Sequence, residues 1–444
     1  MTLSRHRTRQ DRGGNTVRLI MGLLAAPLAV VLLAVVLLAG HVVVPSTAVT
    51  PPVVTAPLPH PAKLAAKLRA VSTKGIGKTA LIVTTTDGQV LTNRSGSTPL
   101  TPASTMKVLT GMAALDVLGP DRTFVTRAVD AGDGRVVLVG GGDPLLTNKT
   151  STSIYKVASL QNLAMTTAAA LKAAGRTSIT LRYDASLFSG PTFSPAWKSK
   201  WRRYEARVAA LEINSGKLGN GRASTNPPAH AAKAFAGRLR SAGITVTSIA
   251  VDKAPATSVE LARVTSTPLT RILKRTLLIS DNVAAETLLR HAAIARGRAG
   301  SFTGAAANLR AWLTEHSLWE PGQKILDGSG LAPGSKLTPK ALAGAIRLAL
   351  ASPKYAPVIA GLPVAGVSGT LKNRFDDKSE RAGRRTVHAK TGTLSGLAGL
   401  AGFVTTADGA VLVFAALGNK ATSYYRVYDW LDREAAAMAR CGCR

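Results

Sequence analysis

Ser104 and Lys107 stand three residues apart in the sequence Ser-Thr-Met-Lys, at the start of a segment that is expected to be helical. Residues at this spacing lie on the same face of a helix, so the two side chains can meet. A serine hydroxyl becomes a nucleophile when a neighbouring base removes its proton, and a lysine can be that base if burial or a nearby cation lowers its pKa. The same spacing also fits an N-cap serine followed by a solvated lysine, so this pair alone does not identify an active site.

A second polar group, Ser280-Asp281-Asn282, interrupts a stretch of helical periodicity over residues 269–295. A hydroxyl and an amide at such an interruption can take part in proton transfer and in binding a peptide group. A structural alternative is that Ser280 or Asp281 caps the helix that follows, with Glu286 supporting that cap.

A third group, Lys390-Thr391-Gly392-Thr393, lies on or at the end of a β-branched, strand-like run. Lys390 offers a cation and Thr391 a hydroxyl, a pair suited to holding a carboxylate. Gly392 leaves room for a substrate backbone to lie alongside the strand. The alternative is an exposed lysine that protects an edge strand from aggregation.

The elements expected to position these residues predict an α/β fold. Strand-like runs near both ends of residues 62–444, with helices between them, indicate an antiparallel sheet assembled from the two ends of this part of the chain. Residues 123–265 mix strand-like runs with Ala-rich helices and many Gly and Pro residues, and are interpreted as an inserted α/β domain. The predicted strands are 79–86, 89–92, 123–129, 135–139, 179–183, 246–251, 386–390, 399–405 and 410–417, and the predicted helices are 103–118, 153–173, 229–241, 269–295, 301–316, 338–350 and 422–438.

Composition excludes several classes of protein. Hydrophobic residues make up 46% of the 444 residues, which is too much for a disordered polyelectrolyte. Cys441 and Cys443 are the only cysteines, so the chain is not a disulfide scaffold. No two histidines have the i, i+4 spacing of a helical zinc site, so we expect no metal hydrolase.

The N-terminus predicts export. Residues 1–18 form a basic tail, expected in the cytoplasm, and residues 19–44 form an apolar segment long enough to cross about 30 Å of hydrocarbon. We interpret this segment as one transmembrane helix that anchors the protein, and a cleaved signal segment remains an alternative. Residues 45–61 are rich in proline and read as an extended linker, so the folded part would lie outside the cytoplasmic membrane, in the cell envelope.

The formal net charge is +32, most of which belongs to the exported part. Outside the membrane the available polyanions are lipid headgroups, wall phosphates and substrate carboxylates, so nucleic acid is not an expected partner. No run of five or more basic residues occurs, and a basic surface without a single docking patch fits the sequence equally well.

In this order, S-x-x-K, S-x-N and K-T-G resemble the signature of the serine penicillin-recognising enzymes. Other segments resemble one family more closely, the D-alanyl-D-alanine carboxypeptidase/endopeptidases, or class C low-molecular-mass penicillin-binding proteins. Those segments are GGGDPL at 140–145, VAALEINSGK at 208–217, DGSGL at 327–331, LPVAGVSGTLKNRF at 362–375 and AKTGTLS at 389–395.

This resemblance implies a transpeptidase-type domain, like that of penicillin-binding proteins and β-lactamases, formed by residues 62–122 and 266–444 and interrupted by the domain at 123–265. It also implies a role for each motif residue. Ser104 would be the acylated nucleophile and Lys107 its proton acceptor. Ser280 would relay a proton, with Lys390 providing the positive charge beside that relay, and Asn282 would hold the substrate amide. The substrate-binding strand would consist of Thr391, Gly392 and Thr393. The N–H groups of Ser104 and Thr393 would form the oxyanion hole.

The implied activity is removal of D-alanine from peptidoglycan stem peptides ending in D-Ala-D-Ala, or cleavage of their cross-links. β-Lactam antibiotics would acylate the same serine, and no metal or organic cofactor would be needed. The resemblance also places Trp197, Trp201 and Tyr204 near the mouth of the cleft. Two alternatives remain: a β-lactamase of the same superfamily, and a non-catalytic polycationic scaffold that binds the cell wall.

Overall fold

The structure is a computed structural model that describes residues 56–150, 153–203 and 205–442. The predicted cytoplasmic tail and transmembrane segment lie outside these residues, as does most of the predicted proline-rich linker. In the part of the chain that the structure describes, no helix is both long and apolar enough to span a membrane.

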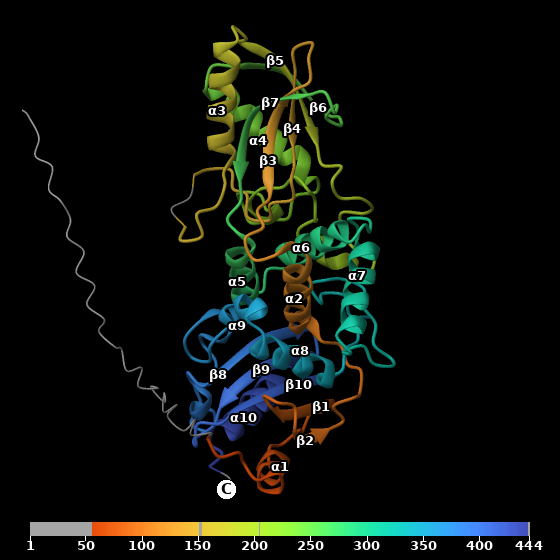
Figure 1. Ribbon diagram of the computed structural model, residues 1–444, viewed down its shortest axis with the longest axis vertical. Coiled ribbons are helices and arrows are strands. Elements are labelled where there is room, and N and C mark those ends of the chain that lie inside the picture. The colour runs from red at the N-terminus through yellow and green to blue at the C-terminus, as the bar shows by residue number, and fades with distance from the viewer. Residues whose placement is uncertain (1–55, 151–152, 204, 443–444) are drawn as a thin grey trace, which may run out of the picture. The chain divides into compact units, whose positions relative to one another are not determined.

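The first of two five-stranded sheets joins the two ends of the folded chain, as the colours of Figure 1 show. Its order is β2-β1-β10-β9-β8, and every neighbouring pair is antiparallel. This confirms the predicted α/β class and an antiparallel sheet built from both termini. The strands are β1 (Ile76–Thr85), β2 (Val90–Arg94), β8 (Val387–Leu394), β9 (Leu397–Thr405) and β10 (Val411–Ala421).

Both faces of this sheet are buried, which explains why β10 is a continuous apolar run. Along β10, Leu412, Phe414 and Ala416 belong to one hydrophobic cluster, while the alternate residues belong to another. Helix α10 (Tyr424–Ala439) and helix α1 (Pro61–Arg69) contribute to the first cluster. The second lies under the other helices of this part of the chain: α2 (Met106–Leu118), α5 (Leu269–Ile279), α6 (Asn282–Ala295), α7 (Phe302–Glu315), α8 (Pro339–Ala351) and α9 (Ala356–Gly361).

The second sheet is formed entirely by residues 125–265 and has the order β6-β5-β4-β3-β7. β4, β5 and β6 are parallel to one another, whereas β3 is antiparallel to both β4 and β7, so the sheet is mixed. The elements are β3 (Val125–Asp130), β4 (Arg135–Val139), α3 (Leu160–Ala173), β5 (Ser178–Asp184), α4 (Pro227–Ser241), β6 (Thr245–Val251) and β7 (Val259–Thr265). Helices α3 and α4 connect the parallel strands and share a hydrophobic cluster with them.

The structure differs from the sequence prediction at α3, β7 and α1, and the short helix α9 was also not predicted. Helix α3 begins at Leu160 rather than near 153, because Ser159 caps it by accepting a hydrogen bond from the Asn162 N–H. Strand β7 was not predicted, since it is an edge strand in which Ala262 alone is fully buried and the apolar signal is weak. Helix α1 begins at Pro61, the last residue of the predicted linker, and is held by the buried pair Leu64 and Leu68.

Candidate active site

Ser104 lies in a short 3-10 turn, Ala103–Thr105, that leads directly into α2. The Pro102 carbonyl closes this turn by accepting hydrogen bonds from the N–H and the hydroxyl of Thr105. Ala103 has a positive φ of 47° and is fully buried, so the turn is a constrained backbone rather than a regular helical start. The half-buried Ser104 side chain is therefore presented at the helix N-terminus.

Lys107 is fully buried one turn further on, and its ammonium group has three oxygen neighbours. Nζ lies 2.8 Å from Ser104 Oγ, 2.7 Å from Asn282 Oδ1 and 2.8 Å from the Ser329 carbonyl oxygen. A neutral amine has two N–H donors and one lone pair. With Asn282 and Ser329 accepting the two donors, the lone pair faces the Ser104 hydroxyl, which is the geometry of a base and its nucleophile.

Burial makes that neutral amine more accessible near neutral pH. Burial lowers the pKa of Lys107 to about 8, although nearby carboxylates oppose the shift. Lys390 is also fully buried, and its pKa is held well below the usual range by burial and by the Lys107 charge. The two lysines therefore disfavour each other's charge. Because Lys390 is buried, the alternative of an exposed lysine that protects an edge strand is wrong.

The Ser280-Asp281-Asn282 turn separates α5 from α6. Asp281 is the cap of α6, accepting from the Ala284 N–H, and it also pairs with Arg275 at 2.6 Å. Ser280 ends α5 in the left-handed conformation, with φ 62°. Its hydroxyl makes no hydrogen bond to any residue that the structure describes, whereas Asn282 contacts Lys107 and lines the cleft of Ser104.

Glu286 does not support the helix cap, contrary to the alternative drawn from the sequence. Its buried carboxylate instead accepts hydrogen bonds from the N–H groups of Gly328 and Ser329, at 3.0 Å and 2.7 Å. Asp327 holds the same segment, accepting from Trp197 Nε1 at 2.8 Å and from the Ala332 N–H at 2.7 Å. These two carboxylates fix the DGSGL segment so that the Ser329 carbonyl points at Lys107.

The Lys390–Thr393 motif lies on β8, an edge of the first sheet, against the Ser104 turn. A Cβ atom on Gly392 would lie 2.6 Å from the Pro102 carbonyl oxygen and 3.0 Å from the Ser104 nitrogen. Gly392 is thus required for close packing of β8 on the nucleophile's turn, and the expectation that it also leaves room for a substrate backbone stays a prediction. Lys390 Nζ donates to the Thr391 carbonyl, and Thr391 Oγ1 lies 2.7 Å from Thr370 Oγ1.

Glu205 is the site residue that the motifs did not reveal. Its Oε2 accepts a hydrogen bond from Asn282 Nδ2 at 3.0 Å. Nothing local in the sequence marks it, because its partner is 77 positions away along the chain. The only available signal was its position between Trp201, which the resemblance puts near the mouth of the cleft, and VAALEINSGK, a segment that resembles the family.

Ser104 opens into a cleft of about 290 Å³. Its walls include Trp201, Glu205, Asn282 and Thr393, together with the exposed side chains of Lys198 and Lys200. Trp201 therefore lies where the family resemblance put it, whereas Trp197 is buried in hydrogen-bonded contact with Asp327, and Tyr204 lies outside the described residues.

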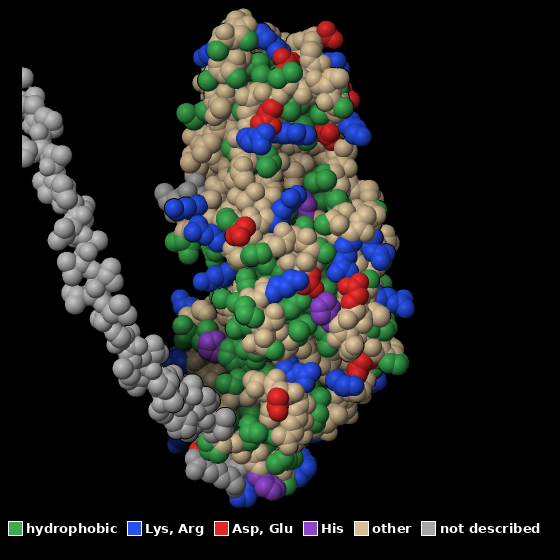
Figure 2. Space-filling view, viewed as in Figure 1, with side chains coloured by type: hydrophobic (Ala, Val, Ile, Leu, Met, Phe, Trp, Pro, Cys, Tyr) green, Lys and Arg blue, Asp and Glu red, His purple; other side chains and the backbone are tan. Residues whose placement is uncertain are grey.

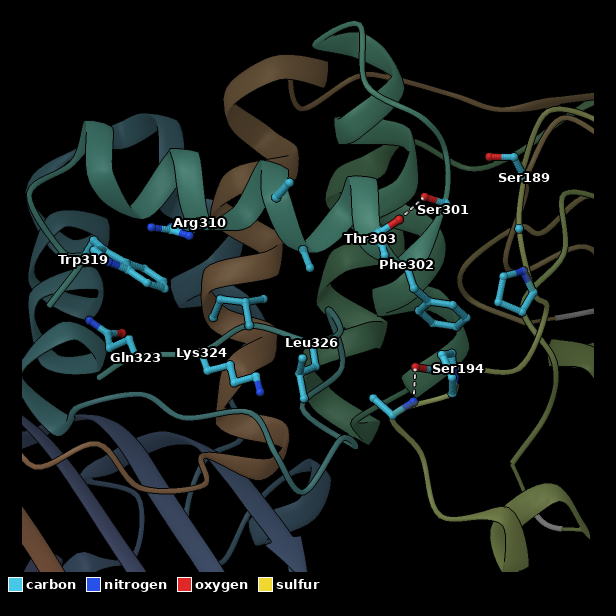
Figure 3. A pocket seen from close by; sticks show the side chains of 17 residues that line it. Ser189, Ser194, Ser301, Phe302, Thr303, Arg310, Trp319, Gln323, Lys324 and Leu326 are labelled. Atoms are coloured by element: carbon cyan, nitrogen blue, oxygen red, sulfur yellow. Dashed lines mark hydrogen bonds between the residues drawn. The ribbon is translucent and has the colours of Figure 1, made fainter. Parts of the chain in front are cut away.

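A larger hollow, about 760 Å³, contains none of the motif residues. Figure 3 shows Arg310 beside Trp319 at one end of it and Phe302 near Ser194 at the other. Its walls are mostly apolar and include no acidic residue.

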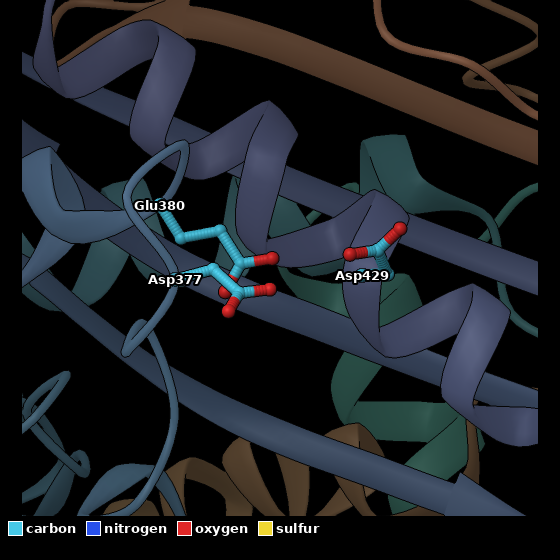
Figure 4. Close-up of side chains that lie close together, drawn as sticks. All are labelled: Asp377, Glu380 and Asp429. Atoms are coloured by element: carbon cyan, nitrogen blue, oxygen red, sulfur yellow. The ribbon is translucent and has the colours of Figure 1, made fainter.

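Three carboxylates that could hold a cation gather elsewhere. Oxygens of Asp377, Glu380 and Asp429 lie within 4.8 Å of one another, the first two from a loop and the third from α10 (Figure 4). Arg433 already pairs with Asp429 at 2.9 Å. The cluster contains no motif residue, and the expectation that the reaction needs no metal stays a prediction.

On the face shown in Figure 2, Lys and Arg side chains do not gather in one patch. They are spread over the whole height of the folded part. Acidic side chains are interspersed among them on this face. A dispersed basic surface is therefore the better description of this face than one docking patch.

Comparison with solved structures identifies the fold. The fold is similar to that of penicillin binding protein 4 from Haemophilus influenzae, with a TM-score of 0.71 over 85% of this chain and 98% of that one, at 22% sequence identity. A complex of that protein with a β-lactam gives a TM-score of 0.65 over the same shares.

The family follows from sequence. Residues 62–220 and 217–427 match the D-Ala-D-Ala carboxypeptidase 3 (S13) family, and the chain belongs to it. The chain is 34% identical to a carboxypeptidase of Mycobacterium tuberculosis, over 89% of this chain and 87% of that protein. It is also 34% identical to carboxypeptidase DacB of Mycolicibacterium smegmatis, over 90% and 89% of the two chains.

Proposed function

We propose that the protein is a serine D-Ala-D-Ala carboxypeptidase that trims or un-crosslinks peptidoglycan stem peptides through an acyl-enzyme on Ser104. The observation that carries this proposal is the buried Lys107 amine, held by Asn282 and the Ser329 carbonyl with Ser104 Oγ at 2.8 Å. Membership of the carboxypeptidase family supplies the substrate class.

In the acylation step Lys107 takes the Ser104 proton while Oγ attacks the carbonyl carbon of the penultimate D-alanine. The N–H groups of Ser104 and Thr393 would stabilise the oxyanion, a role supported by the close packing of β8 on the Ser104 turn. The C–N bond then breaks, and the leaving amine takes its proton through Ser280, whose hydroxyl is free to relay it. Water hydrolyses the ester on Ser104 and restores the enzyme.

Substrate recognition would be shared between strand β8 and Asn282. One N–H of the Asn282 amide is directed to Glu205, and the other is left to hold the substrate amide. Thr391 and Lys390 would hold the terminal carboxylate, whose negative charge stabilises a cation on Lys390 and so keeps Lys107 neutral.

We also propose the domain boundaries stated from the sequence, a catalytic domain of residues 62–122 and 266–444 with an insertion at 123–265. The separation of the two sheets along the chain supports this division. Anchoring by residues 19–44 in the cytoplasmic membrane and contact with anionic wall polymers are further parts of the proposal, supported by the apolar segment and the net charge of +32.

Intact-protein mass spectrometry with benzylpenicillin tests the function. The wild-type protein is expected to gain one penicillin mass, and Ser104→Ala none. Release of D-alanine from a D-Ala-D-Ala peptide should follow the same pattern. Rapid penicillin hydrolysis without a lasting adduct would indicate a β-lactamase instead, and neither adduct nor hydrolysis in folded protein would favour the wall-binding scaffold.

A further inference from the structure

The Asn282 amide is held at both ends. Its Oδ1 accepts from Lys107 Nζ at 2.7 Å, and its Nδ2 donates to Glu205 Oε2 at 3.0 Å. We propose that Glu205 is a positioning residue for acylation: it fixes the orientation of the Asn282 amide toward Lys107, and its negative charge sets the pH range in which Lys107 accepts the Ser104 proton. This rests on the proposed acyl-enzyme function.

The orientation matters because an amide has one accepting end and one donating end. If the Asn282 amide were reversed, its NH₂ group would face the Lys107 amine, donor against donor, and Lys107 would lose one of the two acceptors that direct its lone pair. An ionised carboxylate can only accept, so Glu205 permits the observed orientation and excludes the reverse. Glu205 thus acts on Ser104 indirectly, through the side chains of Asn282 and Lys107.

The charge of Glu205 acts on Lys107 as part of a larger set. The carboxylates that favour the Lys107 cation are Asp327, Glu286, Asp281 and Glu205, and Lys390 is the like charge that disfavours it. Asp327 and Glu286 are fully buried acceptors of backbone N–H groups, and Asp281 caps α6. Of these four carboxylates, Glu205 alone also lines the cleft beside Ser104, so it can be altered without removing a buried backbone partner.

Glu205 is placed by the segment between β5 and α4, just after a 3-10 turn at Ser199–Arg203. Its N–H donates to the Trp201 carbonyl at 2.8 Å, which ties it to a second residue of the cleft wall. The segment interpreted as an insertion therefore contributes a side chain to the hydrogen-bond network of the nucleophile.

The test is the rate of acylation by benzylpenicillin, measured by quenched-flow mass spectrometry across a pH series. Glu205→Gln keeps an acceptor for Asn282 and removes the charge, so its rate on the alkaline plateau should stay within about threefold of wild type. Its rate profile should shift to lower pH, because Lys107 loses its proton more easily without the nearby negative charge. Glu205→Ala should show the same shift and a plateau about tenfold lower, the usual effect of losing a hydrogen bond to a charged group.

Two controls separate positioning from general damage. Glu260→Gln removes a carboxylate that pairs with Arg263 on β7, outside the cleft, and should leave both the plateau and the profile unchanged. In an Asn282→Ala background, Glu205→Ala should no longer lower the plateau, while the shift of the pH profile should persist.

The proposal would be overturned if Glu205→Ala had the same plateau rate of acylation and the same pH profile as wild type. It would also be overturned if Glu205→Gln and Glu205→Ala slowed acylation equally with no shift in the profile. Thermal unfolding of each variant verifies that the rates come from folded protein. Failure of the proposed function is distinguishable, since wild type itself would then form no adduct.

Discussion

At the scale of single residues, the centre of the site is a pair of buried lysines that disfavour each other's charge. Burial lowers the pKa of Lys107 to about 8, and burial together with the Lys107 charge holds the pKa of Lys390 well below its usual range. The pair therefore holds one proton more readily than two. A substrate carboxylate beside Thr391 would draw that proton onto Lys390 and leave Lys107 neutral, so the substrate itself would help to activate the base.

This argument predicts the behaviour of Lys390→Met. Without a cation site at 390, the remaining proton stays on Lys107 at neutral pH, and acylation by benzylpenicillin at pH 7 should fall by about tenfold or more. Raising the pH to about 9 should recover much of that rate, because Lys107 then loses its proton to solvent. Acylation rates at the two pH values check this, and a loss of equal size at both would contradict the shared-proton account.

A second residue prediction concerns Glu286, whose pKa burial raises to about 7. A carboxyl group that is harder to ionise in the folded than in the unfolded protein makes the folded state bind more protons between about pH 4.5 and 7. The free energy of unfolding should therefore fall as pH rises through this window, and Glu286→Gln should weaken that dependence. Urea unfolding at several pH values measures how the free energy of unfolding changes with pH in wild type and in Glu286→Gln. The same change in both proteins would contradict a raised pKa of Glu286.

At the scale of elements, catalysis depends on how closely β8 approaches the turn that carries Ser104. Gly392 is where they meet, with the Pro102 carbonyl and the Ser104 nitrogen both too near for a Cβ atom. Since both contacts are backbone atoms of a constrained turn, neither can move aside as a flexible side chain would.

Gly392→Ala should accordingly separate β8 from the Ser104 turn. We expect a loss of about 1–3 kcal/mol in the free energy of unfolding, the usual range for overpacking, and a much larger proportional loss of acylation. Gly219→Ala is the matched control, because a Cβ atom there meets nothing within 4 Å. Denaturant unfolding and penicillin acylation of both variants provide the comparison, and normal acylation by Gly392→Ala would refute the close-packing argument.

The same elements show what the sequence could predict and what it could not. Periodicity located α2 and the break between α5 and α6, and the motifs located Ser104, Lys107, Asn282 and Lys390. The Ser329 carbonyl escaped because a backbone acceptor has no residue type, and Glu205 escaped because its contact with Asn282 is long-range. The alternative in which Glu286 supports a local cap is wrong, because its carboxylate binds a pair of N–H donors 42 and 43 positions away.

At the scale of the whole molecule, the first sheet, which carries the Lys390–Thr393 motif, can form only when both ends of the folded chain are present. β1 pairs with β10 from Ile76 with Ala421 to Thr85 with Leu412, so the chain's first and last strands are neighbours. The second sheet needs only residues 125–265. A truncation before Val411 should therefore abolish penicillin acylation, because it removes β10, the middle strand of the first sheet, whose residues belong to both hydrophobic clusters.

Also at this scale, the proposed anchor and the net charge lead to different expectations for how the protein is retained on a membrane. The proposed anchor at residues 19–44 and the net charge of +32 would both favour membrane association, the first by hydrophobic insertion and the second by electrostatic attraction. Hydrophobic insertion is insensitive to ionic strength, whereas attraction of a basic surface to anionic lipid is screened within about 3 Å at 1 M salt. The full chain should therefore stay with membranes in a 1 M NaCl wash and be released by detergent. A chain starting at residue 45 should be released by salt alone, and release of the full chain by salt would assign its retention to surface charge instead of the span.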